Sequence, residues 1–133
     1  MRKMISVWAI VLLFSSSLFG VELNWEKDTA TAFAKAKAEK KNVVLMVEAS
    51  HCRWCKKMKQ QTLADQEVKK RLQNYILVKV LRSDSEAMKI LPESYYPAPT
   101  TFFMTPEGEI MEKAIGFFEA SDFITYINDV EEN

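Results

Sequence analysis

The sequence predicts a single α/β domain in which a central mixed sheet, made of parallel strands and a C-terminal antiparallel hairpin, is flanked by helices. Apolar segments at residues 43–47 and 75–80 alternate with helical segments, which is typical of parallel strands joined by crossover helices. A turn with proline and glycine at residues 105–108 separates two further strand-like segments, which indicates a hairpin. A length of 133 residues fits one domain.

The first third of the domain predicts a strand, a helix and a second strand. Residues 24–27 form a short extended segment. Asp28 or Thr29 can cap the alanine-rich helix that follows, and residues 40–42 end it. The continuous apolar run at residues 43–47 predicts a strand that is buried on both faces.

The middle of the domain alternates helices with a strand. Residues 53–61 have a helical pattern, and Asp65 can cap a further helix. The apolar residues 75–80 predict the next strand. Residues 84–91 predict a short helix that Pro92 stops.

The C-terminal part predicts the hairpin and a closing helix. Residues 100–104 and 110–115 form its two strands, on either side of the proline–glycine turn. Gly116 follows the second strand, and Ser121 can cap a last amphipathic helix. We therefore expect the antiparallel pair to lie at one edge of the sheet.

The first 20 residues have the pattern of a secretory signal peptide. Two basic residues precede an apolar stretch, and small residues lead to a cleavage site that we place after Gly20, with Ser17 as the alternative. The stretch is shorter than the roughly 20 residues of a spanning helix, although an uncleaved membrane anchor stays open as an alternative. We expect residues 1–20 to be a signal peptide and residues 21–133 to be a periplasmic domain.

The composition argues against several classes of function. Lys and Arg total 18 and Asp and Glu total 18, so the basic excess of a nucleic-acid-binding protein is missing. Three glycines provide no glycine-rich phosphate loop. The single histidine, His51, excludes a multi-histidine zinc site and argues against a Ser-His-Asp triad.

The chemistry of the chain centres on its two cysteines, Cys52 and Cys55, which are spaced Cys-x-x-Cys. In an oxidising compartment such a pair is a structural disulfide, a redox pair or half of a metal site. A structural disulfide across so short a loop constrains the unfolded chain little. A zinc site would need two more ligands, and haem attachment would need a histidine where Lys56 stands. The spacing therefore favours a redox pair.

Three separate features of the chain together resemble the thioredoxin-fold family. The Cys-Arg-Trp-Cys motif at residues 52–55 lies between a predicted strand and a predicted helix. Pro99 precedes a strand, where that family keeps a cis-proline, and Gly116 follows the hairpin at the expected distance. The resemblance covers roughly residues 24–131, and it is nearest to exported bacterial thioredoxin-like proteins whose motif is followed by Lys-Lys-Met, as at residues 56–58.

The resemblance implies a thioredoxin-like fold and a protein thiol–disulfide oxidoreductase that uses no cofactor. Cys52 would be the nucleophile and Cys55 the resolving cysteine, and Pro99 would turn the Ala98 backbone towards the sulfurs. A helix N-terminus and basic neighbours such as Arg53 predict a Cys52 pKa below the usual value of about 8.5. Its partners would be exported proteins with disulfides or thiols and a membrane redox protein, with reduction the favoured direction.

Several residues near the motif allow two interpretations. The buried acid of the family falls on Met46, and Glu48 points to the same face of the strand as Met46. Glu48 is either a substitute acid or base near Cys55 or a solvated residue at a strand end. His51 either adds positive charge beside the sulfurs or is an exposed ring without a role. Trp54 is either a contact surface for a partner or a ring folded back on its helix.

Two other functions remain open from the sequence. The domain could be a non-catalytic module that binds a soft metal such as copper(I) through Cys52 and Cys55, with Met58 nearby. It could also be a scaffold with an inert disulfide. The direction of the exchange depends on the reduction potential relative to the partner.

Overall fold

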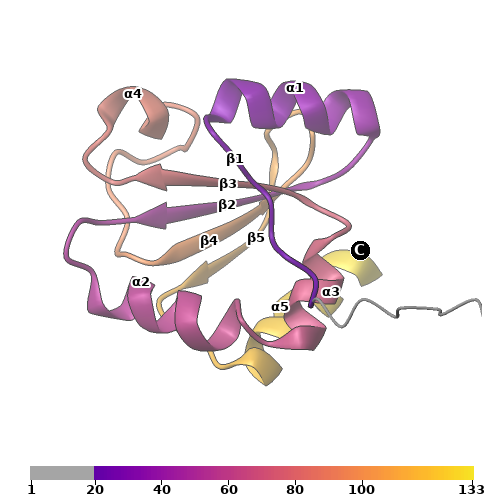
Figure 1. Ribbon diagram of the computed structural model, residues 1–133. Helices are drawn as coiled ribbons and strands as arrows, with labels where there is room; N and C mark the ends of the chain where they lie inside the picture. Colours follow the sequence, from indigo (N-terminus) through magenta and orange to yellow (C-terminus); the bar gives the residue numbers. More distant parts are fainter. Residues whose placement is uncertain (1–19) are drawn as a thin grey trace, which may run out of the picture.

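A computed structural model of the protein describes residues 20–133, so the expected signal peptide lies outside the described residues except for Gly20. A five-stranded mixed sheet in the order β1-β3-β2-β4-β5 forms the centre, with helices on both faces (Figure 1). The strands are β1 (Trp25–Glu26), β2 (Val43–Glu48), β3 (Ile76–Leu81), β4 (Thr100–Met104) and β5 (Ile110–Ile115). The helical segments are α1 (Thr29–Glu39), α2 (Arg53–Lys57), the π-helical turn η1 (Met58–Thr62), α3 (Gln66–Leu72), α4 (Ser85–Met88) and α5 (Ala120–Glu132).

Strand β2 lies in the middle of the sheet, as its apolar run predicted. It pairs in parallel with β3 and antiparallel with β4, and the side chains of residues 43–47 are fully buried. Strands β4 and β5 form the predicted antiparallel hairpin. Its turn includes Gly108, whose φ of 90° is favourable for glycine and costly for other residues. The predicted mixed sheet is therefore confirmed.

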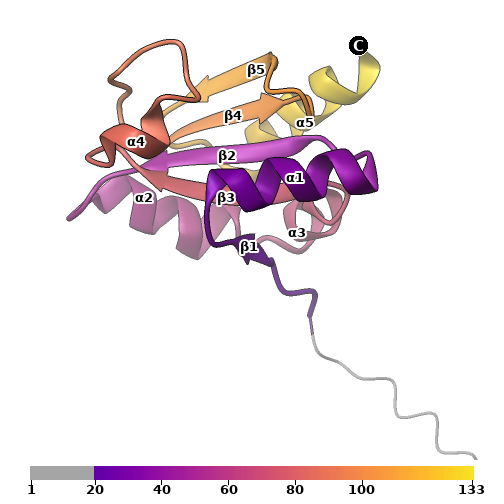
Figure 2. The ribbon, with the colours of Figure 1, turned by 90° about the horizontal axis from the view of Figure 1, so that it is seen from above.

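The alternation of side chains along β2 divides the core into two layers. One layer lies between the sheet and helices α1 and α4, which cover the face turned towards the viewer in Figure 2. The other layer lies between the sheet and η1, α3 and α5. Val43, Leu45 and Val47 point into the first layer, whereas Val44 and Met46 point into the second. Among residues 20–133, no helix is both long and apolar enough to span a membrane.

The predicted helix at residues 53–61 changes its winding after Lys57. The N–H group of Leu63 donates to the carbonyl oxygen of Met58 at 2.9 Å, which is the pattern of a π turn. The wider turn buries Thr62, whose hydroxyl donates to the carbonyl oxygen of Phe118 in the loop before α5. A distant hydrogen-bond partner therefore accompanies the departure from the α-helix, and the local sequence does not reveal that partner.

Two helix boundaries differ from the prediction. Helix α4 ends at Met88 because the chain leaves the helix to bury Leu91 in the layer beneath α1. Helix α5 begins at Ala120 with Glu119 at its N-cap and no side-chain capping bond. The prediction that Ser121 caps this helix is therefore wrong, since Ser121 already lies in the first turn. Asp28 and Asp65 do cap α1 and α3, as predicted.

Candidate active site

The two cysteines lie where the chain passes from the C-terminal end of β2 into α2. Cys52 is the N-cap of α2, and Cys55 lies in the first turn of that helix. The two residues form a disulfide, with a Cα–Cα distance of 5.2 Å. The backbone N–H of Cys55 donates to Cys52 Sγ at 3.1 Å. Cys52 is half-buried and Cys55 is buried, so a sulfur on another protein can approach only Cys52 readily.

The loop before β4 lies against the sulfur of Cys52. The Ala98–Pro99 peptide bond is cis, and the carbonyl oxygen of Ala98 lies 3.6 Å from Cys52 Sγ. The Thr100 hydroxyl donates to the carbonyl oxygen of Pro97 at 2.6 Å. The N–H of Gly116 donates to the carbonyl oxygen of Pro99 at 2.8 Å. These bonds hold the Ala98 backbone beside the disulfide, as the family resemblance implies.

A hollow of about 350 Å³, which we call the Trp54 groove, lies on this surface and is lined by Trp54, Ala98, Gly116 and Phe117. The Trp54 side chain is 46% exposed, and its ring centroid lies 6.0 Å from that of Phe117. Gly116 has a φ of 97°, so the chain turns there and presents Phe117 to the groove. Sequence reasoning missed Phe117, although two adjacent phenylalanines after a glycine were the available signal.

The groove has a positively charged rim. The guanidinium carbon of Arg53 lies 5.1 Å from the centre of the Trp54 ring. The ammonium nitrogen of Lys57 lies 5.2 Å from the same ring and 4.5 Å from that of Phe117. Both contacts are within the range of cation–π attraction. The structure therefore joins Arg53 and Trp54 to the site and adds Lys57.

Glu48 ends β2 on the face that carries Met46 and is covered by the helices after the motif. Its carboxylate lies 3.7 Å from the ammonium of Lys79, and that ammonium lies 4.3 Å from the centre of the Trp25 ring. The Glu48 side chain is 23% exposed. Glu48 is therefore a partly buried, paired carboxylate below the redox helix.

His51 is exposed and has a φ of 55° in the loop between β2 and α2. This left-handed conformation is unfavourable for a residue with a side chain. The structure places His51 directly before the nucleophile candidate and gives its ring no described hydrogen bond.

In the described part of the chain, the candidate metal ligands at this site are the sulfurs of Cys52 and Cys55. Among residues 20–133, no group of three or more His, Cys, Asp or Glu side chains could hold a metal ion. Met58, the thioether that a copper(I) site could have used, is fully buried in the core below the sheet. The donor set for copper(I) would therefore be Cys52 and Cys55 alone.

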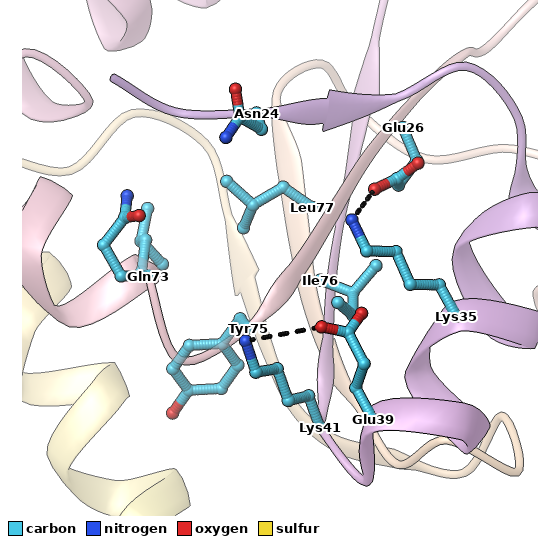
Figure 3. A pocket seen from close by; sticks show the side chains of 10 residues that line it. Asn24, Glu26, Lys35, Glu39, Lys41, Gln73, Tyr75, Ile76 and Leu77 are labelled. Carbon is cyan, nitrogen blue, oxygen red and sulfur yellow. Dashed lines mark hydrogen bonds and ion pairs between the residues drawn. The ribbon is translucent and has the colours of Figure 1, made fainter. Parts of the chain in front are cut away.

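A second hollow, of about 130 Å³, lies at the opposite end of β2 (Figure 3). Lys35 pairs with Glu26 at 2.8 Å, and Lys41 pairs with Glu39 at 3.9 Å, as the dashed lines in Figure 3 show. Burial and the Glu131 carboxylate raise the pKa of Tyr75, which also lines the hollow, to about 12. Its charges are thus balanced within the hollow itself.

Comparisons with known proteins agree with this geometry. The profile of a family described as thioredoxin-like matches residues 24–106. The C-terminal domain of Neisseria meningitidis DsbD in the oxidised form is 28% identical, with 78% of this chain and 90% of that chain covered and a TM-score of 0.60. A DsbH oxidoreductase is 20% identical, with 91% of this chain and 92% of that chain covered and a TM-score of 0.70. A thioredoxin from Thermus thermophilus is 21% identical, with 81% and 86% covered and a TM-score of 0.68. No curated protein sequence matches the chain.

Proposed function

The chain belongs to the thioredoxin-like family and is a thiol–disulfide oxidoreductase, and on that premise we propose that it is an exported enzyme that reduces disulfides in other exported proteins. The observation that carries the proposal is the difference between the two sulfurs. Cys52 is accessible at the N-cap of a helix, whereas Cys55 is buried one turn further on. This arrangement supports Cys52 as the attacking group and Cys55 as the resolving group.

The attacking group must be a thiolate, because thiols react slowly with disulfides. Free backbone N–H groups and the positive end of the helix dipole stabilise an anion at an N-cap. The N–H of Cys55 already points at Cys52 Sγ, and Arg53 and Lys57 lie on the same helix. These groups favour the thiolate of Cys52 in the reduced protein.

The reaction proceeds in two exchange steps. The Cys52 thiolate attacks one sulfur of the substrate disulfide, and the other substrate sulfur leaves as a thiolate that takes a proton from water. Cys55 then loses its proton and attacks Cys52 Sγ, which releases the second substrate sulfur. Two electrons have passed to the substrate, and the protein holds the Cys52–Cys55 disulfide. A membrane-bound dithiol protein would return two electrons and complete the cycle.

Glu48 would receive the proton from Cys55 in the second step. Its position on the face below the redox helix supports this role, and its carboxylate lies 3.7 Å from the ammonium of Lys79. Glu48→Gln should slow release of the mixed disulfide and leave its formation unchanged. Glu39→Gln, at the other end of the molecule, is the matched control. Equal effects on both steps would reject a proton-transfer role for Glu48.

The direction of exchange depends on the reduction potential of the Cys52–Cys55 couple. A stabilised thiolate makes Cys52 a good attacking group and also favours the dithiol form of the protein. Reduction therefore requires a substrate whose disulfide has a higher potential. Equilibration with glutathione buffers measures the potential, and a value above those of exported disulfide substrates would contradict the reductase proposal.

A trapping experiment tests the activity in its compartment. Full-length Cys55→Ser, expressed in a Gram-negative host, should hold exported proteins as mixed disulfides, since no resolving thiol remains. Cys52→Ser/Cys55→Ser is the control and should hold none. Fractionation and N-terminal sequencing of the same sample test the signal peptide at residues 1–20. Absence of trapped proteins, together with failure of the reduced wild type to reduce insulin, would reject the enzymatic proposal.

A further inference from the structure

The charges of the protein are distributed unevenly around the disulfide. Residues 49–64 carry four Lys or Arg residues and no Asp or Glu, whereas the rest of residues 20–133 carries 12 Lys or Arg and 18 Asp or Glu. The segment from the end of β2 through η1 is therefore basic within an acidic domain. The four cations are Arg53, Lys56, Lys57 and Lys59.

These cations are not neutralised by the protein itself. Among the ion pairs of residues 20–133, none joins any of the four to a carboxylate. Arg53 and Lys57 instead lie over the ring of Trp54, and Lys57 also lies over the ring of Phe117. Arg53 and Lys57 thus stand at the rim of an apolar groove whose wall includes Ala98, the residue next to the Cys52 sulfur.

We propose that the preferred substrate is a protein segment in which the disulfide cysteine adjoins an apolar side chain and is flanked by carboxylates. The apolar side chain would occupy the Trp54 groove, and the carboxylates would bind Arg53 and Lys57 at its rim. This inference rests on the proposed function and adds the class of substrate to it. Charge complementarity of this kind steers the encounter and favours one class of partner over others.

Reaction rates with matched peptides test this inference. Three disulfide-linked peptides of equal length carry a leucine beside the cysteine and, on both sides of that pair, aspartates, asparagines or lysines. The reduced wild-type protein should react with the aspartate peptide about tenfold faster than with the asparagine peptide at low salt, and slowest with the lysine peptide. Salt at 0.3 M should reduce the preference, because it screens interactions between exposed charges more than about 6 Å apart.

Variants that remove positive charge test whether Arg53 and Lys57 cause the preference for the aspartate peptide. Arg53→Gln/Lys57→Gln should bring the rate ratio of the aspartate and asparagine peptides close to one. Lys37→Gln/Lys70→Gln removes the same charge from exposed positions on α1 and α3 and should keep the ratio. Equal wild-type rates with the aspartate and asparagine peptides, or an unchanged ratio in Arg53→Gln/Lys57→Gln, would overturn the inference.

A small neutral disulfide separates this inference from the proposed function. The reduced protein should react with 2-hydroxyethyl disulfide, which presents neither carboxylates nor a large apolar side chain. Reaction with this reagent but no preference among the peptides would overturn only the substrate class. No reaction with any disulfide would overturn the proposed function itself.

Discussion

The two ends of β2 differ in how their charges are used. At the end where the strand begins, Lys35 and Lys41 are paired with Glu26 and Glu39 in a polar hollow. At the end where the strand stops, Glu48 pairs with Lys79, but Arg53 and Lys57 lie over aromatic rings, beside an apolar groove and a reactive sulfur. The charges of the first hollow already neutralise each other, so little electrostatic attraction remains for a ligand. Unpaired charge next to a nucleophile is thus the better mark of a functional site in this molecule.

Substitutions at the two ends of β2 should differ most in their effect on the rate of disulfide exchange. Cys52→Ser should reduce the rate of disulfide exchange to that of buffer alone, because no thiolate remains to attack. Glu39→Gln, at the first hollow, should retain the wild-type rate. Insulin reduction with dithiothreitol measures both variants. A residual rate in Cys52→Ser that depends on protein concentration would mean that Cys55 attacks substrate directly, against its buried position.

The groove should matter for peptides and not for small disulfides. Trp54→Ala removes the exposed ring that packs on Phe117 and should lower the rate with a leucine-containing peptide disulfide about tenfold, which corresponds to about 1.4 kcal/mol. The rate with 2-hydroxyethyl disulfide should change less than twofold. Equal losses with both reagents would show that Trp54 acts on the sulfur itself and not on substrate binding.

Each end also holds one described non-glycine residue with a left-handed backbone, and these two residues make a matched pair. Lys40 has a φ of 54° after α1, and His51 has a φ of 55° before α2. Glycine at either position should raise the free energy of unfolding by about 0.5–1 kcal/mol, measured by urea denaturation. Lys40→Gly should leave exchange rates unchanged. His51→Gly should shift the pH dependence of the rate only if the imidazole stabilises the thiolate, which tests that hypothesis separately.

Tyr75 should affect stability and not activity, and its stabilising effect should disappear at high pH. Its hydroxyl donates to Glu131 at 3.3 Å, so Tyr75→Phe should cost about 0.5 kcal/mol at pH 7. Because the pKa of Tyr75 is raised to about 12, the stabilisation is complete below pH 10 and is lost as the pH rises towards 12. Tyr75→Phe should therefore weaken the fall in urea midpoint between pH 9 and pH 11.5. Tyr95→Phe, at an exposed tyrosine, is the control and should leave the fall in urea midpoint unchanged.

Most of the fold could be predicted because its signals are local. The apolar run of β2, the aspartate caps of α1 and α3 and the turn of the hairpin each depend on a few neighbouring residues. The π turn after Lys57 and the early end of α4 could not be predicted. The first involves a hydrogen bond from Thr62 to the loop before α5, and the second involves burial of Leu91.

The residues of the site also divide into those that were expected before the structure and those that were not. The resemblance to the thioredoxin-fold family implied that Pro99 and the cysteines lie close together, and the Ala98 carbonyl oxygen lies 3.6 Å from Cys52 Sγ. Phe117 and Lys57 could not be assigned to the groove, because their contact with Trp54 depends on the path of the chain after Gly116. Glu48 was located on the correct face by strand alternation, but its partner Lys79 comes from the neighbouring strand.

The hydrogen bond from Thr62 to Phe118 has a mechanical consequence. It connects Phe118, the residue after the groove-lining Phe117, to the segment that continues the cysteine-bearing helix. The contacts of Phe117 with Trp54 and Lys57 join the same two parts of the chain. The groove is therefore held to the cysteine-bearing helix at three points.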